Sequence, residues 1–265
     1  MSSKPELYSS KYGTWFQDPL VVQAYPARPP YPPVLIQHLV DLISDEPRVV
    51  LDVGCGTGDI ARRLAPLVER VDALDASAGM LAAGRAASGG DAPNLRWIHA
   101  RVEDADAPLA PPYALITAGE SAHWFEWDIA FPRFARILSP GGMLAIAGRN
   151  WDGPPDVHAR VLPIMKRFNL LRTWYNVNLL DELRNRGLFD LTGQLRFEPD
   201  VWQPTLDEYI LARHSQRSFS RTHMGPDAVA AFDAALAEAL ADVPRVDGRL
   251  QLESSAHVSW GRPRR

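Results

Sequence analysis

The segment VVLDVGCGTGDI at residues 49–60 constrains the fold more than any other part of the chain. It begins with an apolar run typical of a strand covered on both faces, made by Val49, Val50, Leu51 and Val53. The glycines that follow let the backbone turn sharply and approach a ligand closely; they are Gly54, Gly56 and Gly58. Asp59 is expected at the N-cap position of the next helix. The segment therefore predicts the strand, turn and helix that begin a mononucleotide-binding unit.

The spacing of the glycines leaves two ligand classes open. Gly56, Gly58 and Ala61 fit G-x-G-x-x-A, the spacing of a dinucleotide-binding turn. Asp52 lies two residues before the first glycine, where a diphosphate would meet a like charge, so a ligand with an ammonium group suits the turn better. Asp75 ends the predicted second strand, about twenty residues further on, where an acid is expected to hold a ribose diol. S-adenosylmethionine (SAM) has both the ammonium group and the diol.

Several motifs carry a resemblance to a known family. They are LDVGCGTG at 51–58, LDAS at 74–77 with Met80, GESAHWFEW at 119–127, YPARPPYP at 25–32 and RILSPGG at 136–142. The chain resembles the class I SAM-dependent methyltransferases, and most closely a small-molecule group, methyltransferase type 11-like, that has an Ala-His-Trp-Phe signature. The resemblance implies SAM as cofactor, S-adenosylhomocysteine (SAH) as its product, and a small-molecule acceptor.

The resemblance also implies which residues contact SAM. The expected contacts are Tyr25, Arg28, Asp52, Gly54, Gly56, Asp75, Ala76, Ser77, Met80, Val102, Glu103, Ala118, Gly119 and Glu120. Arg101 departs from the family pattern, because an aspartate that meets the adenine amine is commoner there. The Val102 backbone and Glu103 are therefore the expected adenine contacts. Arg28 is expected to reach the cofactor's carboxylate, although a solvated arginine on a proline-rich turn is the alternative.

His123 is the candidate catalytic residue, because it follows the fourth predicted strand, where a base would take the acceptor's proton. The alternative is a structural histidine packed beside Trp124. The N-terminal aromatic residues Tyr8, Tyr12, Trp15 and Phe16 share one face of a helix, which predicts a lid over the cofactor or a face packed on the core. Expected substrate contacts are Tyr8, Tyr12, Trp124, Trp174 and Tyr175, with His158 as a further candidate. Cys55 is interpreted as a small residue in a tight loop.

The order of predicted elements indicates an α/β fold. Strands are expected near 48–53, 70–75, 95–99, 113–118, 142–149, 194–202 and 249–260, and helices near 32–43, 59–68, 77–87, 127–138, 156–190, 205–214 and after Pro226. The resemblance arranges these as a Rossmann-like, seven-stranded, mostly parallel sheet with one antiparallel strand and helices on both faces. The expected parts are an N-terminal lid at 1–30, a SAM-binding core at 31–150, a helical substrate-binding insertion at 151–200, and the C-terminal part of the core at 201–265.

Composition limits the remaining possibilities. The 265 residues are 46% hydrophobic, so one large core is expected. A net charge of −4 gives no general attraction to nucleic acid or anionic lipid. The single cysteine excludes an internal disulfide, and the absence of an apolar span or signal core favours a cytoplasmic protein without a membrane partner. No cluster has metal-ligand spacing, so no metal is expected, and the sequence leaves a homo-oligomer open.

The predicted activity is methyl transfer from SAM to a small molecule, with an oxygen nucleophile as first choice and an amine as second. Direct displacement of a neutral thioether rests on alignment, desolvation and removal of the nucleophile's proton. A carboxylate acceptor would need no base, which is the test of any such role for His123. The alternatives are an NAD-dependent oxidoreductase and a SAM-binding protein without transferase activity.

Overall fold

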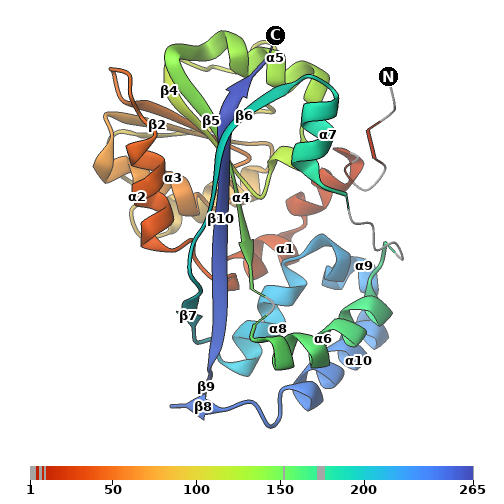
Figure 1. The fold of residues 1–265 in the computed structure, drawn as a ribbon. Helices are drawn as coiled ribbons and strands as arrows, with labels where there is room; N and C mark the ends of the chain where they lie inside the picture. The colour runs from red at the N-terminus through yellow and green to blue at the C-terminus, as the bar shows by residue number, and fades with distance from the viewer. Residues whose placement is uncertain (1–3, 6–7, 9, 152, 172–176, 265) are drawn as a thin grey trace.

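A mixed β-sheet runs through the protein in a computed structural model that describes residues 4–5, 8, 10–151, 153–171 and 177–264 (Figure 1). Its strand order is β3-β2-β1-β4-β5-β10-β6, with β7 paired to β10 beside this path. The strands are β1 (Val49–Val53), β2 (Arg70–Asp75), β3 (Leu95–His99), β4 (Tyr113–Gly119), β5 (Leu138–Asn150), β6 (Phe189–Arg196), β7 (Asp200–Trp202) and β10 (Leu252–Pro263). A small separate ribbon pairs β8 (Arg245–Val246) with β9 (Arg249–Leu250).

The pairing confirms the predicted topology. β1 is parallel to β2 and β4, and β4 is parallel to β5. β10 is antiparallel to both β5 and β6, so it is the antiparallel member of a mostly parallel sheet. The strand predicted at 194–202 divides into β6 and β7, and Pro199, which has no N–H to donate to a ladder, lies in the gap between them. The sheet therefore has eight strands in place of the expected seven.

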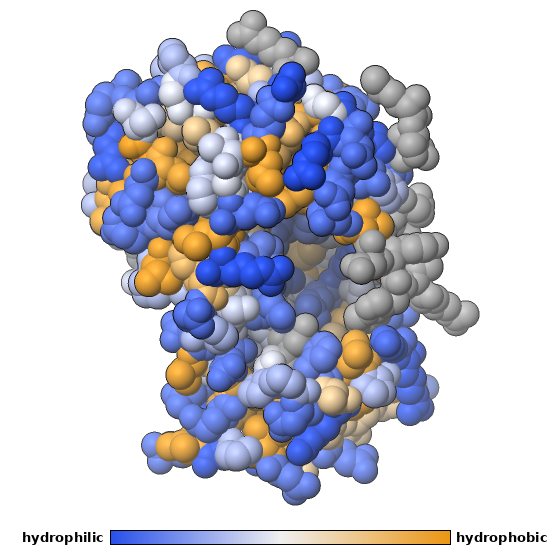
Figure 2. Space-filling model, in the orientation of Figure 1, coloured by the Kyte–Doolittle hydropathy of each residue, from blue (hydrophilic) through white to orange (hydrophobic). Residues whose placement is uncertain are grey.

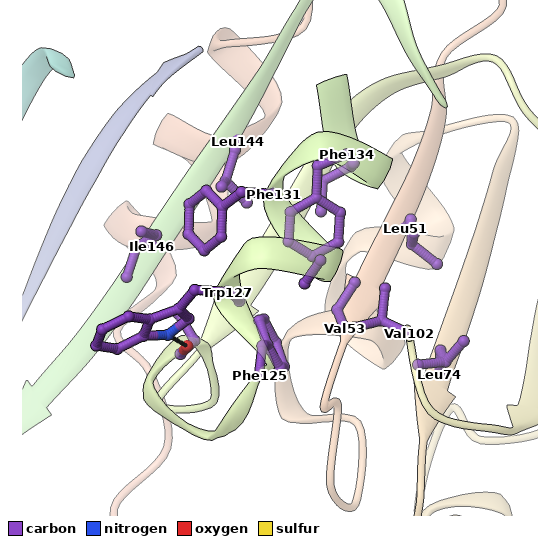
Figure 3. Packing of buried hydrophobic residues seen from close by; sticks show 14 of the residues in the cluster. Leu51, Val53, Leu74, Val102, Phe125, Trp127, Phe131, Phe134, Leu144 and Ile146 are labelled. Atoms are coloured by element: carbon purple, nitrogen blue, oxygen red, sulfur yellow. Dashed lines mark hydrogen bonds between the residues drawn. The ribbon is translucent and has the colours of Figure 1, made fainter. Parts of the chain in front are cut away.

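Helices cover both faces of the sheet. They are α2 (Pro33–Asp41), α3 (Asp59–Leu64), α4 (Ala78–Ala86), α5 (Trp127–Ile137) and α7 (Leu179–Asn185). On one face, Leu35 and Leu39 of α2 and Leu64 of α3 form a buried cluster with Val50 of β1. The opposite cluster contains Phe131 and Phe134 of α5, packed against Leu51 and Val53 (Figure 3). The indole of Trp127 in the same cluster donates to the Ala122 carbonyl at 2.9 Å.

The alternation of side chains along β1 sets the position of Asp52. Val49, Leu51 and Val53 face α5, whereas Val50 faces α2 and α3. Because successive side chains of a strand point to opposite faces, Asp52 shares the face of Val50. There it is 1% exposed, and it accepts a 2.7 Å hydrogen bond from Thr117 Oγ1 of β4. A carboxyl group is thus fixed under the glycine turn.

A helical lobe lies beyond the carboxyl end of β5, at the bottom of Figure 1. It consists of α6 (Pro155–Phe168), α8 (Leu206–His214), α9 (Arg221–Met224) and α10 (Pro226–Ala239). Its own cluster includes Val161 and Met165 of α6 together with Phe232 and Leu236 of α10. Among the described residues of the helix predicted at 156–190 there are two separate helices: α6 belongs to this lobe, whereas Leu183 of α7 packs on the sheet. The domain boundaries drawn from the sequence remain predictions.

The N-terminal segment connects the lobe to the sheet. It contains the 3₁₀ helix η2 (Ser10–Gln17), α1 (Pro19–Ala24) and the 3₁₀ turn η3 (Tyr25–Ala27). Ser77 of the sheet domain donates to the Phe16 carbonyl at 3.1 Å, and Ser220 before α9 donates to Asp18 at 3.0 Å. The Trp15 ring stacks on His223 of α9 at 3.8 Å. Figure 2 shows that the surface is hollowed between the helical lobe and the part of the molecule that contains the sheet.

None of the helices in the described part of the chain combines the length and the apolar character that crossing a bilayer requires.

We expect Gly193→Ala to lower the free energy of unfolding by about 1–3 kcal/mol, the range for overpacking. A Cβ at Gly193 would lie 2.3 Å from the ring of Trp260, across the β6–β10 pair. Chemical denaturation measures the effect, and Thr192→Val, at the exposed neighbouring position, is the control. Equal stability of the parent and Gly193→Ala would show that Trp260 moves aside without cost.

Candidate active site

The glycine turn after β1 lets other groups approach its backbone closely. Gly54, Gly56 and Gly58 have φ values of 64°, 56° and 75°, in the left-handed region that favours glycine. A Cβ on Gly54 would lie 2.6 Å from the Cβ of Ser121, and one on Gly56 would lie 3.2 Å from the Tyr25 ring. The turn is therefore restricted to glycine by backbone conformation and by space.

Asp75 ties the end of β2 to this turn. Its Oδ2 accepts the Gly56 N–H at 2.8 Å and its Oδ1 accepts the Ser77 N–H at 2.8 Å. Burial raises the pKa of Asp75, although the two N–H bonds oppose that shift. A carboxylate has about four acceptor positions, so each oxygen retains capacity for a ligand hydroxyl.

A cavity, here called the main cavity, opens at the carboxyl ends of β1, β2 and β4. Its volume is about 340 Å³. Nine of the fourteen residues predicted to contact the cofactor line it: Tyr25, Gly54, Gly56, Asp75, Ala76, Met80, Val102, Glu103 and Glu120. Trp124 also lines it, as does Arg101, whose Nε lies 3.3 Å from Glu103 Oε2.

Some lining residues of the main cavity were missed from the sequence. Gly13, Thr14 and Gln17 reach it from η2, beside Phe16, which the aromatic pattern did indicate. Ser121 lines it too and donates to the Val53 carbonyl at 2.6 Å, so that it closes the loop after β4 onto β1. No motif marks the three η2 positions, which reach the cavity because η2 docks over the turn, whereas Ser121 lies within GESAHWFEW.

A second cavity, the Asp52 cavity, adjoins the main cavity through Tyr25 and Gly54, which line both. Its volume is about 290 Å³. It contains three residues that were predicted to contact the cofactor and that lie outside the main cavity: Arg28, Asp52 and Gly119. Ser77 instead caps α4 through a 3.3 Å bond to the Met80 N–H, and Ala118 is buried in the sheet.

Burial controls the protonation of Asp52. Removal from water raises its pKa to about 7, against the opposing effect of the Thr117 hydroxyl. A cation placed beside it would favour the ionised form. Cys55 lines the same cavity, and burial together with the nearby carboxylates raises the pKa of its thiol, so the thiol is protonated at neutral pH.

Glu120, Arg149 and Arg28 form an ion network whose members line the main cavity and the Asp52 cavity. Arg149 of β5 donates from Nη2 to Glu120 Oε2 at 2.6 Å, and Arg28 Nη1 lies 3.6 Å from the same oxygen. Although burial alone would raise it, these two arginines hold the pKa of Glu120 below its usual value. Arg28 also donates from Nε and Nη2 to Ser215, at the end of α8. Glu120 itself has a φ of 53°, which is uncommon for a residue with a side chain.

A third cavity, the His123 cavity, lies between the loop after β4 and the helical lobe. It has a volume of about 320 Å³ and shares Phe16, Glu120 and Trp124 with the main cavity. Its remaining lining comes from His123, Arg28, α6, the end of α8, and η6 (Arg217–Phe219) with the residues around it. His158, a candidate from the sequence, is among the α6 residues. A wall of three residues thus divides the cofactor candidate site from this cavity.

His123 is a neutral imidazole in this setting. Burial is the main cause that lowers its pKa to about 3, and the positive charges of Arg217, Lys4 and Arg28 lower it further. Its ring lies 4.2 Å from the Trp124 ring and 5.5 Å from the Tyr8 ring. A group with this pKa is a weak base at neutral pH, so the role of proton acceptor stays a prediction that this environment disfavours.

The other predicted substrate contacts divide into two groups. Tyr8 packs beside His123 and donates its hydroxyl to the Val177 carbonyl at 2.9 Å, and it lines none of the three cavities. Trp174, Tyr175 and the side chain of Tyr12 lie outside the described residues. Within the described part of the chain, no group of three or more His, Cys, Asp or Glu residues is placed to hold a metal ion.

Comparisons with known proteins show what the core of the chain is similar to. Residues 50–142 match the sequence model of the methyltransferase domain. The chain is 36% identical over 97 residues to an uncharacterized methyltransferase of Mycobacterium tuberculosis, and 32% identical over 124 residues to one of Schizosaccharomyces pombe. These alignments cover 37% and 45% of this chain, and 48% and 47% of the relatives, so the chain spans about half the length of the curated relatives it matches.

A solved structure shows the same fold. A protein of Anaeromyxobacter dehalogenans, provisionally named a type II methyltransferase, superposes with a TM-score of 0.63 at 24% identity. The superposition covers 89% of this chain and 97% of that chain.

We expect the ring of His123 to remain neutral from about pH 5 to pH 8, because its pKa is lowered to about 3. The histidine ring resonances of the uniformly labelled protein, followed by NMR during a pH titration, measure this, and His123→Gln identifies the resonance. A midpoint near the ordinary value of 6.5 would contradict the buried, positively charged environment.

Proposed function

We propose that this chain transfers the methyl group of SAM to a small-molecule acceptor, because residues 50–142 match the sequence model of the methyltransferase domain. The observation that carries the proposal is the Asp75 carboxylate, fixed by two backbone N–H groups at the rim of the main cavity. SAM supplies an activated methyl group on a sulfonium ion. The residues of the chain bind and align the two reactants and exclude water from the space between them.

The main cavity suits the adenosine part of SAM. Asp75 has acceptor capacity for the two ribose hydroxyls, and the glycine turn lets the backbone approach. Met80 and Ala76 offer apolar contact for the adenine ring, with Val102 and Glu103 at its polar edge. We assign η2 as the cover of this site, because Gly13, Thr14, Phe16 and Gln17 line the cavity from the N-terminal segment.

The Asp52 cavity suits the amino-acid end of SAM. A cationic ammonium group beside Asp52 would offset the desolvation that raises the pKa of that carboxyl group. Arg28 and Arg149 line the same cavity, and Arg28 is the one predicted to reach the ligand's carboxylate. The lining therefore contains both a carboxyl group and guanidinium groups, which match the ammonium and carboxylate groups of an α-amino acid.

The acceptor is assigned to the His123 cavity. Phe16, Glu120 and Trp124 line both this cavity and the main cavity, so a molecule in one would lie beside a molecule in the other. An oxygen nucleophile is the first choice and an amine the second. Residues of α6 and η6 would contact the body of the acceptor, which makes these elements the expected determinants of substrate choice.

We expect Asp75→Asn to weaken SAH binding by about 1.5–3 kcal/mol while the protein stays folded, because a charge-assisted hydrogen bond to the ribose diol is lost. Titration calorimetry of folded protein measures the affinity, and Asp91→Asn, at an exposed position after α4, is the control. An unchanged affinity would remove Asp75 from the site.

We also expect SAH binding to release about half a proton per protein molecule at pH 7, since Asp52 with a pKa of about 7 is half protonated there and the ammonium group favours its ionised form. Calorimetry in buffers of different ionisation enthalpy counts the protons. Asp52→Asn should remove this release, and Asp41→Asn, on α2, should preserve it. The same proton count in the parent and in Asp52→Asn would place the ammonium group elsewhere.

A further inference from the structure

Positive charge dominates the His123 cavity. Three arginines line it, Arg28, Arg213 and Arg217, and among the described lining residues Glu120 is the one carboxylate. Glu120 is already bound by Arg149 and also faces Arg28. The Glu120 carboxylate is therefore already paired with two arginines, and an acceptor in this cavity would meet the guanidinium groups of Arg213 and Arg217 in its lining.

Arg213 and Arg217 are held in place by aromatic rings. Arg213 is 1% exposed, donates to the Tyr209 hydroxyl at 2.8 Å and lies 4.5 Å from the centre of the Trp151 ring. Arg217 lies 4.4 Å from the centre of the Trp124 ring. Trp124 borders both the main cavity and the His123 cavity, so Arg217 stands beside the junction at which methyl transfer is proposed.

The rest of the cavity is apolar. Val161, Leu162 and Met165 of α6 and Phe219 of η6 contribute to its lining. A small molecule with an anionic end near Trp124 and a hydrocarbon body toward α6 would satisfy both kinds of wall. A cationic amine, in contrast, would be repelled by the guanidinium groups.

On the basis of the proposed function, we propose that the acceptor is a carboxylic acid, that Arg217 orients its carboxylate at the junction with the main cavity, and that methyl transfer gives a methyl ester. The carboxylate oxygen provides the electron pair for the new bond to the methyl carbon, while the pair of the breaking bond stays on the sulfur atom. A carboxylate and a sulfonium ion become a neutral ester and a thioether, and no proton is transferred.

The chemistry of this step agrees with the site in a second respect. A hydroxyl or ammonium acceptor would require a base, and His123, whose ring lies 4.2 Å from that of the shared wall residue Trp124, is a weak base there. A carboxylate is ionised at neutral pH and needs none. His123 then contributes to the wall, packed between Tyr8 and Trp124.

The first experiment supplies methyl-labelled SAM with a panel of acceptors: benzoic, phenylacetic and octanoic acids, each beside the corresponding primary alcohol and primary amine. We expect label in the acids, released as labelled methanol by mild alkali, which distinguishes a methyl ester from an ether or a methylamine. Labelling of the alcohols or amines in place of the acids, or of no acid while the protein binds SAH, would overturn the carboxylate assignment and leave the SAM site intact. Failure to bind SAH would overturn the proposed function itself.

The second experiment tests Arg217. In Arg217→Gln we expect the KM for the labelled acid, and its Kd for SAH-loaded protein measured by calorimetry, to rise about ten- to hundredfold, as for loss of a charge-assisted bond, with the KM for SAM within about twofold. Arg217→Lys, which keeps the charge, should lose less. Arg221→Gln is the matched control, because Arg221 pairs with Asp233 and does not line the cavity. An unchanged Kd for the acid in Arg217→Gln would overturn the role of Arg217.

Discussion

The ion network of Glu120, Arg149 and Arg28 is the interaction on which the arrangement of the site depends. Its members come from the loop after β4, from β5 and from the N-terminal segment, and Arg28 extends it to Ser215 at the end of α8. Arg149 also donates to the Pro29 carbonyl and stacks on Tyr31. Removing one partner of such a buried pair leaves an uncompensated charge and costs about 3–5 kcal/mol. The backbone of Glu120 adopts a left-handed φ of 53° to place its carboxylate there.

The same network determines how the three cavities relate to one another. Glu120 lines the main and His123 cavities, and its arginine partners line the Asp52 cavity. Because the N-terminal segment supplies both Arg28 and the η2 residues over the main cavity, its contacts with Ser215 and Ser220 join the cofactor cover to the helical lobe. A displacement of the lobe would therefore move a wall of all three cavities together.

Local patterns in the sequence carried the predictions that the fold and the comparisons confirm. The apolar run 49–53, the glycines after it and the spacing to Asp75 predicted β1, its turn and β2, and the resemblance of these motifs implied a class I methyltransferase. The match of residues 50–142 to the methyltransferase-domain model favours SAM over the dinucleotide that the glycine spacing left open. Boundaries that depend on a single proline, such as the break between β6 and β7, were missed. Contacts such as Arg28 with Ser215, far apart in sequence, and the cavity positions of Gly13, Thr14 and Gln17 have no local pattern, because they arise when separate elements dock.

Burial and long-range charge also explain why the chemical role of His123 could not be read from its motif. The segment GESAHWFEW places a histidine after β4, where a base is useful, but the pKa of that histidine depends on Arg217, Arg28 and Lys4, which belong to other parts of the chain. The positive potential that disfavours a proton on His123 is the same potential that favours an anion in the adjoining cavity. Under the proposal of a carboxylate acceptor, a weak base and a binding site for an ionised nucleophile are two consequences of one charge arrangement, in which orientation by the guanidinium groups replaces proton removal.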